Sequence, residues 1–173
     1  ELLDCLLYNS KTEKENFIVY GLTPEEIKSA IIEKHPDIVG ISVHSTTQSK
    51  HAELVAQIVK EVDPKIITVL GGPDPSVRYS YFLQNKNCDF CVVGDGEETF
   101  LEFIQNFPIA SSTKIIKGLA YKKNANIIYE PRLFDTCLDY LPFPAYDLID
   151  LDKYLNNPNF YRIRSQINKQ STT

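Results

Sequence analysis

Asp37-Ile-Val-Gly-Ile-Ser-Val-His-Ser-Thr-Thr47 is the stretch that decides the fold of this chain. A short apolar run follows Pro36 and ends in side chains that carry hydroxyl or imidazole groups. This pattern is typical of a strand that is buried on both faces and leads into a polar loop. Residues 66–70, Ile-Ile-Thr-Val-Leu, repeat it and run into Gly71, Gly72 and Pro73. With a helix between the two strands, the pattern predicts a βαβ unit whose ligands bind at the carboxyl ends of the strands.

Composition limits the class of protein. The chain has 173 residues, of which 43% are hydrophobic and 24% are charged, and this suits one domain with an appendage. The net charge of -5 gives no basic surface for nucleic acid. No apolar run approaches the roughly 18 residues of a membrane helix. We therefore expect a soluble protein without a nucleic-acid or membrane partner.

The four cysteines, Cys5, Cys88, Cys91 and Cys137, form no evenly spaced framework. Without a signal peptide, a reducing cytoplasm is the expected location. Cys88-Asp-Phe-Cys91 matches Cys-x-x-Cys, but Cys91 begins an apolar run, no second ligand pair is present and no helix starts at the motif. We therefore favour a structural role over a metal-binding or redox role for this pair.

Helix signals recur between the predicted strands. Residues 1–8 have the pattern of a buried strand, and residues 9–16 that of a polar connection. Thr23-Pro24-Glu25-Glu26 predicts a helix start, because Thr23 and Glu26 can form a capping box around a proline at the first helical position. Its expected inner face is Ile27, Ala30 and Ile31. A second helix is predicted over 50–62 and a short one within 76–85.

The second half begins with a predicted strand over 89–93. The loop Gly94-Asp95-Gly96-Glu97-Glu98-Thr99 follows, with Asp95 as the expected cap of a helix and Glu98 as its capping-box partner. The expected core face of that helix is Phe100, Leu101, Ile104 and Phe107. Residues 114–121 and 126–130 predict a β-hairpin, and the proline-punctuated segment 131–173 predicts an extended linker.

Together these elements predict an α/β fold, a doubly wound, Rossmann-like parallel sheet flanked by helices and followed by the hairpin. The predicted domain boundaries are 1–130 for the α/β domain and 131–173 for the linker. Loops 42–48, 71–76 and 94–99 would form one crevice. The residues alone do not identify the ligand of this crevice. Neither the phosphate-binding motif Gly-x-x-x-x-Gly-Lys-Ser/Thr nor a complete dinucleotide-binding motif Gly-x-Gly-x-x-Gly is present.

Five motifs in order resemble one family. They are Ser42-Val43-His44, Leu70-Gly71-Gly72-Pro73, Val93-Gly94-Asp95-Gly96-Glu97-Glu98-Thr99, Gly118-Leu119-Ala120-Tyr121 and Leu138-Asp-Tyr-Leu-Pro-Phe-Pro-Ala145. Together they resemble the N-terminal cobalamin-binding region of B12-dependent radical S-adenosylmethionine enzymes, in the group of the anaerobic magnesium-protoporphyrin IX monomethyl ester oxidative cyclase. The resemblance covers nearly the whole chain.

The resemblance implies that this domain binds cobalamin, with the nucleotide tail between the sheet and its helices. Ser42 would contact the buried base, and Gly71 and Gly72 would leave room for the tail. For the glycine pair the alternative is a plain strand-to-loop turn. The full set of expected cofactor-binding residues is Ser42, His44, Thr46, Gly71, Gly72, Pro73, Gly94, Gly96 and Glu97. No catalytic residue and no protein metal ligand is assigned.

Two features of related proteins are absent from this sequence. The loop with Asp-x-His-x-x-Gly, which carries the lower-ligand histidine, has no counterpart, because residue 1 already aligns with the second strand of the fold. Cys-x-x-x-Cys-x-x-Cys, which holds a 4Fe–4S cluster, is also absent. We expect that cluster, and S-adenosylmethionine, in a C-terminal radical domain of the same polypeptide. The cysteine motif should follow Thr173 within about twenty residues, since the linker has the composition of an interdomain connection. The complete enzyme that contains this domain would be an oxidative cyclase or a methyltransferase.

His44 has two interpretations. Counting by two along the strand places Gly40, Ser42 and His44 on one side, so the imidazole could reach the crevice and coordinate cobalt. The interpretation we favour is that His44 bonds a loop carbonyl or caps the next helix, because related proteins take their ligand from a different loop or have none.

Two alternatives for the whole domain stay open: a cofactor-free docking domain, and an α/β domain that binds a nucleotide or receives a phosphoryl group. The second is poorly supported, because Asp74 and Asp95 lack a convincing lysine partner.

Overall fold

The computed structural model describes residues 1–5, 7, 11–14, 17–107, 115–133 and 139–156. The chain divides into two compact units. One comprises Glu1–Ile27 together with Cys137–Thr173, and the other comprises Lys28–Thr136. The second unit contains the sheet and all the residues of the candidate site.

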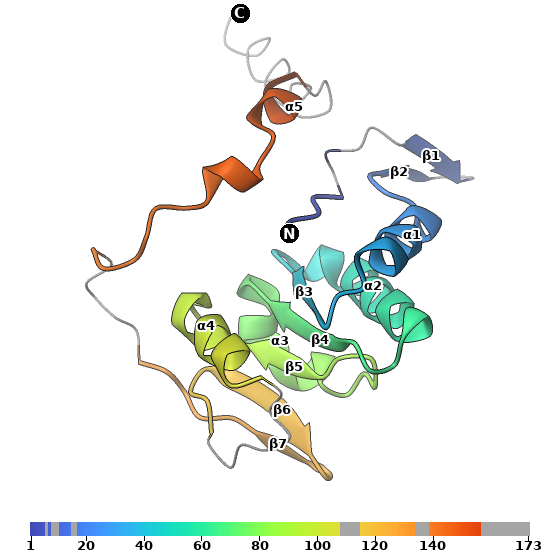
Figure 1. Cartoon of the computed structure of the whole chain (residues 1–173). Helices are drawn as coiled ribbons and strands as arrows, with labels where there is room; N and C mark the ends of the chain where they lie inside the picture. The colour runs from blue at the N-terminus through green and yellow to red at the C-terminus, as the bar shows by residue number, and fades with distance from the viewer. Residues whose placement is uncertain (6, 8–10, 15–16, 108–114, 134–138, 157–173) are drawn as a thin grey trace, which may run out of the picture. The chain divides into compact units, whose positions relative to one another are not determined.

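A five-stranded sheet forms the centre of the second unit (Figure 1). Its strands are β3 (Ile38–Ser42), β4 (Ile67–Gly71), β5 (Phe90–Val92), β6 (Leu119–Lys123) and β7 (Asn126–Ile128), in that spatial order. The first three are parallel, and β6 and β7 continue the sheet in antiparallel pairing. The predicted α/β, Rossmann-like sheet is confirmed. The predicted hairpin is confirmed as well, and it extends the same sheet.

Helices cover both faces of this sheet. α2 (Ser49–Val62) and α3 (Pro73–Phe82) lie on one face, where Ala52 and Phe82 pack with Leu70 and Cys91. α4 (Glu97–Gln105) lies on the other, where Phe103 packs with Val69 and Val92. The predicted βαβ unit is confirmed, because β3 and β4 are parallel neighbours joined by α2.

The capping box at Thr23 is confirmed. The amide of Glu26 donates to Thr23 Oγ1 at 3.2 Å, and the amide of Thr23 donates to Glu26 Oε2 at 2.7 Å. α1 (Pro24–Lys34) follows, with Ile27 and Ile31 buried as expected. Every signal at this helix start is local, since each donor and acceptor lies within one turn.

The prediction that the Asp37 strand is buried on both faces is wrong. Within the described sheet β3 has a strand neighbour on one side alone, and Gly40 and Ser42 are exposed. Val43, just after the strand, is fully buried. An apolar run cannot distinguish a central strand from an edge strand of which one face is covered.

Two predictions for the N-terminal residues are also wrong. Among residues 1–5 and 7 no strand forms, and Leu2 and Leu3 are 55% and 42% exposed. The predicted polar connection contains β1 (Lys11–Lys14), which pairs in antiparallel fashion with β2 (Phe17–Tyr20). β1 is a strand because its backbone pairs with β2. The polar composition of β1 does not predict that pairing.

α3 begins earlier than predicted, and α4 has a different cap and a different buried face from those predicted. α3 begins at Pro73, not within 76–85. The N-cap of α4 is Gly96, and no side chain caps it, so the predicted Asp95 cap is wrong. The inner stripe of α4 contains Thr99 and Phe103, both fully buried.

The predicted core residues Leu101 and Ile104 are 57% and 47% exposed. Phe100 and Phe107, also predicted, pack against the core as half-buried residues. The stripe follows the i, i+4 spacing from Thr99 rather than the most apolar residues.

The predicted linker contains two short helical elements. These are η3 (Tyr146–Leu148) and α5 (Leu151–Asn156), both in the first unit. Within that unit the hydroxyl of Tyr154 donates a hydrogen bond to Asp4, although 150 positions separate the two residues. None of the helices in the described part of the chain has the length and apolar character to cross a membrane.

Candidate functional site

Three loops meet at the carboxyl ends of the parallel strands, as the sequence predicts. The amide of Val43, after β3, donates to the carbonyl of Gly71 at the end of β4 at 2.8 Å. The amide of Gly94, after β5, donates to Ser76 Oγ in the first turn of α3 at 2.9 Å. These contacts bring loops 42–48, 71–76 and 94–99 together at one edge of the sheet.

One part of the α4-covered sheet face carries almost no side-chain bulk. Ser42 and Gly71 are register partners at the last positions of β3 and β4. Gly40 lies two residues before Ser42 on the same face, and both are exposed. We call Gly40, Ser42 and Gly71 the bare strip. Phe100 of α4 marks its boundary, because its ring lies 3.9 Å from where a Cβ atom of residue 40 would be.

The two neighbouring glycines have different explanations. Gly72 has φ of +105°, and a Cβ atom there would lie 2.9 Å from the carbonyl oxygen of Val43. The strand-to-loop turn therefore accounts for Gly72. A Cβ atom on Gly71 would meet nothing nearer than Val92 Cβ at 3.7 Å, an ordinary contact. The packing of the chain around a Cβ atom therefore does not require glycine at residue 71.

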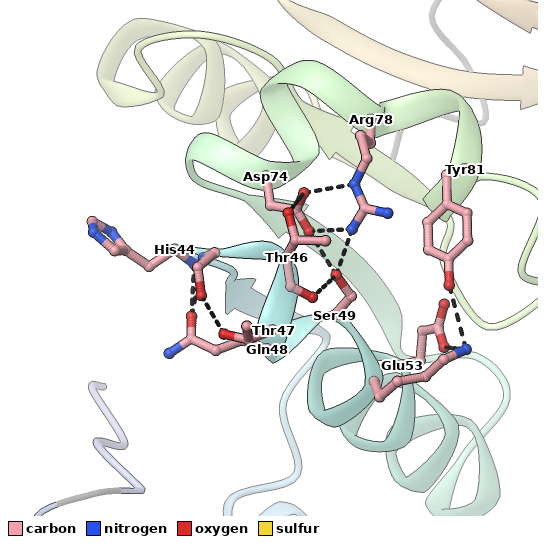
Figure 2. A network of polar contacts seen from close by, with 11 residues as sticks. His44, Thr46, Thr47, Gln48, Ser49, Glu53, Asp74, Arg78 and Tyr81 are labelled. Carbon is pink, nitrogen blue, oxygen red and sulfur yellow. Dashed lines mark hydrogen bonds and ion pairs between the residues drawn. The ribbon is translucent and has the colours of Figure 1, made fainter.

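The loop after β3 is held by Gln48, not by His44. Gln48 Oε1 accepts hydrogen bonds from the amides of His44 at 3.0 Å and Ser45 at 3.3 Å, and η1 (Thr46–Gln48) leads into α2. The His44 side chain is exposed and points away from the polar network (Figure 2). No hydrogen bond of the imidazole is present among the described residues. The prediction that this imidazole bonds a loop carbonyl or caps the helix is wrong.

A buried carboxylate, Asp74, lies behind this loop (Figure 2). Arg78 donates to it twice, from Nε to Oδ1 at 2.7 Å and from Nη2 to Oδ2 at 2.6 Å. Ser49 Oγ donates to Oδ2 at 2.7 Å, and Thr46 Oγ1 donates to Oδ1 at 3.3 Å. Hydrogen bonds from Arg78 outweigh the effect of burial and lower the pKa of Asp74 to about 2.

The sequence prediction did not include Asp74 and Arg78 in the site. The available signal was their i, i+4 spacing, which brings acid and base together on one side of a helix. That signal depended on recognising that α3 begins at Pro73. Thr46, predicted to bind cofactor, uses its hydroxyl proton in the bond to Asp74.

The remaining predicted site residues lie around the other two loops. Pro73 is exposed at the first position of α3. Gly94 has φ of +83°, Gly96 is the N-cap of α4, and Glu97 is the exposed first residue of that helix. The predicted residues therefore occupy one edge of the sheet, at the ends of three consecutive parallel strands.

The two cysteines of the Cys-x-x-Cys segment belong to the core. Cys88 and Cys91 are buried with their sulfur atoms 3.7 Å apart. The hydrogen bond to Cys91 and burial both raise the pKa of Cys88. These observations support the structural role predicted for the pair. In the part of the chain that the structure describes, no group of three or more His, Cys, Asp or Glu side chains is placed to hold a metal ion.

The fold and the site define an α/β domain whose polar and glycine-containing loops meet at the carboxyl ends of its parallel strands. The B12 binding domain family matches residues 12–104, more than half of the chain. The chain therefore belongs to the B12-binding domain family.

Similar proteins support this assignment. An uncharacterized methyltransferase of Pyrococcus horikoshii, PH0819, is 36% identical over 135 residues, which cover 77% of this chain and 29% of that protein. The anaerobic magnesium-protoporphyrin IX monomethyl ester cyclase of Rubrivivax gelatinosus is 29% identical over 150 residues, 82% of this chain and 26% of that protein. The chain thus spans less than a third of the length of these relatives.

Solved structures share the fold. The cobalamin-dependent S-adenosylmethionine radical enzyme OxsB, with aqua-cobalamin and S-adenosylmethionine bound, superposes with a TM-score of 0.61 at 18% identity, over 76% of this chain and 18% of that one. At this identity the likeness concerns the fold alone. It agrees with the described sheet and its flanking helices.

Proposed function

We propose that this chain binds cobalamin at the carboxyl edge of its parallel strands. Membership of the B12-binding domain family supports the choice of ligand. The observation that carries the proposal is that residue 71 is glycine although the packing of the chain leaves room for a Cβ atom there. A glycine that neither backbone conformation nor packing explains is expected where a ligand approaches the sheet closely.

The bare strip is the surface against which the nucleotide tail would lie. Ser42 is an exposed residue next to Gly71, and its hydroxyl can donate a hydrogen bond to a nitrogen atom of the base. The loop residues would surround the corrin edge; they are His44, Thr46, Gly72, Pro73, Gly94, Gly96 and Glu97. When bound, cobalamin would supply the cobalt chemistry, and the residues of this chain would orient it.

We further propose that the domain acts within a radical S-adenosylmethionine enzyme. The relatives described above are an uncharacterized methyltransferase and an anaerobic magnesium-protoporphyrin IX monomethyl ester cyclase, each more than three times as long as the matched region. The 4Fe–4S cluster and S-adenosylmethionine would belong to a C-terminal domain with Cys-x-x-x-Cys-x-x-Cys. The coding sequence after Thr173 is the direct test: the motif should follow within about twenty residues, as an interdomain linker predicts, and a stop codon there would contradict the enzyme assignment.

The surroundings of Asp74 do not support the phosphoryl-receiving alternative. Such a domain needs a carboxylate that is available to a metal ion and a phosphoryl group. Asp74 is buried and bonded to Arg78, Ser49 and Thr46, so its oxygens face the protein interior. A cofactor-free docking domain differs from the proposal in one measurable property, which is the affinity for cobalamin.

Titration with hydroxocobalamin tests the proposal. Binding should change the visible spectrum of the corrin and raise the melting temperature of the chain. At one hundred times the dissociation constant, the gain in unfolding free energy is about 2.7 kcal/mol. A spectrum and a melting temperature that both stay unchanged at millimolar hydroxocobalamin would contradict the proposal and favour the docking alternative.

A further inference from the structure

The first turn of α3 contacts both of the other site loops. Asp74 contacts residues 43–49, which comprise most of the loop 42–48 and the first residue of α2, at three points. Its amide donates to the carbonyl of Val43 at 3.2 Å, and its carboxylate accepts from Thr46 at 3.3 Å and from Ser49 at 2.7 Å. One residue therefore holds this loop at its start, middle and end.

Ser76, half a turn further along α3, contacts the third loop. Its hydroxyl donates to the carbonyl of Gly72 at 2.8 Å and accepts the amide of Gly94 at 2.9 Å. The hydroxyl thus joins the turn that follows β4 to the loop that follows β5. With Asp74, it connects all three loops through one helical turn.

Arg78 fixes the carboxylate that makes these contacts. Its guanidinium binds both oxygens of Asp74 and also donates to Ser49 Oγ at 2.5 Å. It stacks on the ring of Tyr81, with its central carbon 4.7 Å from the ring centroid. A planar, bidentate pair of this kind restricts the carboxylate to one orientation. Since that orientation faces residues 43–49, the Asp74 side chain acts on the loop and not on a ligand.

We propose that Asp74 and Ser76 are positioning residues for cobalamin, which hold the three loops in the binding arrangement without contacting the cofactor. The inference rests on the proposed function, because it assumes that cobalamin binds between these loops. When loops adopt the binding conformation for only part of the time, the apparent affinity falls by that fraction. Fixing the loops in advance removes this loss.

The experiment compares dissociation constants for hydroxocobalamin by absorbance titration, using the full chain. Asp74→Asn should weaken binding by about tenfold, the loss expected when the loops are correctly placed for a tenth of the time. Ser76→Ala, which removes one hydroxyl group, should weaken it by about threefold on the same reasoning. The smaller change keeps the test valid if Asp74→Asn melts below the assay temperature.

Asp89→Asn is the matched control. Asp89 is also bonded to a cation and to strand groups, since its Oδ2 accepts from Lys60 at 2.6 Å and from the amide of Thr68 at 2.8 Å. It precedes β5, at the opposite end of the sheet from the loops. This variant should lower the melting temperature and leave the affinity for hydroxocobalamin unchanged, so it separates loop placement from general loss of stability.

Hydrogen exchange supplies the second readout. Amides within 43–49 should exchange faster in Asp74→Asn than in the parent chain at a temperature well below melting, and Asp89→Asn should not show this local effect. If folded Asp74→Asn and Ser76→Ala bind hydroxocobalamin with the affinity of the parent chain and show the same amide exchange in the loop, the inference is overturned. The proposed function would remain intact. Absence of hydroxocobalamin binding by the parent chain would instead overturn the proposed function, and the inference with it.

Discussion

Gly72 lies so close to Val43 that a Cβ atom at residue 72 would be 2.9 Å from the carbonyl oxygen of Val43. That oxygen already accepts the amide of Asp74. Gly72 also has φ of +105°, where other residues are strained. The junction between the first two site loops therefore depends on this glycine.

Gly72→Ala should lower the unfolding free energy by about 1–3 kcal/mol, the range for a residue forced into an unfavourable backbone region. Urea denaturation measures this change. Gly71→Ala is the control, because its Cβ atom has ordinary contacts and alanine suits a strand better than glycine by roughly 0.5–1 kcal/mol. Equal stability of the two variants would show that the backbone of Gly72 is not strained.

The Asp74–Arg78 pair predicts a pH dependence of stability. The pKa of Asp74 is about 2 in the folded chain, below the usual value of about 3.9. A depressed pKa stabilises the folded state above the unfolded-state pKa, and this contribution is lost as the pH falls from about 5 towards 2.

Arg78→Met should be less stable than the parent chain at pH 7, because the buried Asp74 carboxylate loses its two hydrogen bonds from the guanidinium. It should also lose less further stability than the parent chain between pH 5 and pH 2, because Asp74 no longer has its cationic partner. Urea unfolding at several pH values tests both effects. Parallel pH profiles for the two proteins would mean that the pair does not stabilise the fold.

We expect His44 to contact bound cobalamin without coordinating cobalt. Metal-ligating histidines almost always have a hydrogen-bond partner on the second ring nitrogen, and no such partner is present here among the described residues. His44→Ala should therefore leave the electron paramagnetic resonance spectrum of bound cob(II)alamin unchanged and weaken binding modestly. Nitrogen superhyperfine splitting that disappears in the variant would instead identify His44 as the lower ligand.

The buried cysteines should be chemically inert in the native chain. The hydrogen bond to Cys91 and burial raise the pKa of Cys88, which reduces the reactive thiolate fraction. Burial also raises the pKa of Cys5, but Cys5 is only half-buried, so iodoacetamide should reach it faster than Cys88 or Cys91. Peptide mass mapping after short exposures measures each rate. Native-state labelling of Cys88 as fast as that of Cys5 would argue for an accessible, functional thiol pair.

Local signals in the sequence were sufficient for much of the fold. The capping box at Thr23 and the alternation of strands with helices involve residues that are close in the chain, and the structure confirms them. β1 was missed because its strand state depends on pairing with β2. The burial of β3 was overestimated because an apolar run does not reveal how many strands flank it.

The site was predictable in place but not in its internal bonds. Strand ends and glycines located the three loops, because parallel strands bring their carboxyl ends to one edge. The contacts of Asp74 with Thr46 and Ser49 join residues 28 and 25 positions apart. Those of Ser76 with Gly94 join residues 18 positions apart. Contacts between residues so far apart depend on how the helices and strands pack. The spacing of residues in the sequence does not predict that packing.

Substitution of Gly71 tests directly whether cobalamin lies against the bare strip. Valine at this position should fold, since the nearest atom to its Cβ is an ordinary contact away and β-branched residues suit strands. Its methyl groups would occupy the space proposed for the cofactor, and overpacking of this kind costs about 1–3 kcal/mol. Lys122→Val, at an exposed position of β6, is the matched control for adding valine to the sheet.

The decisive measurement is the dissociation constant of hydroxocobalamin for the parent chain, Gly71→Val and Lys122→Val, with folding checked by circular dichroism. Gly71→Val should weaken binding by roughly tenfold to a hundredfold at undiminished stability, while Lys122→Val should bind as the parent chain does. Binding of hydroxocobalamin by folded Gly71→Val with the affinity of the parent chain would contradict the placement of cobalamin against the bare strip.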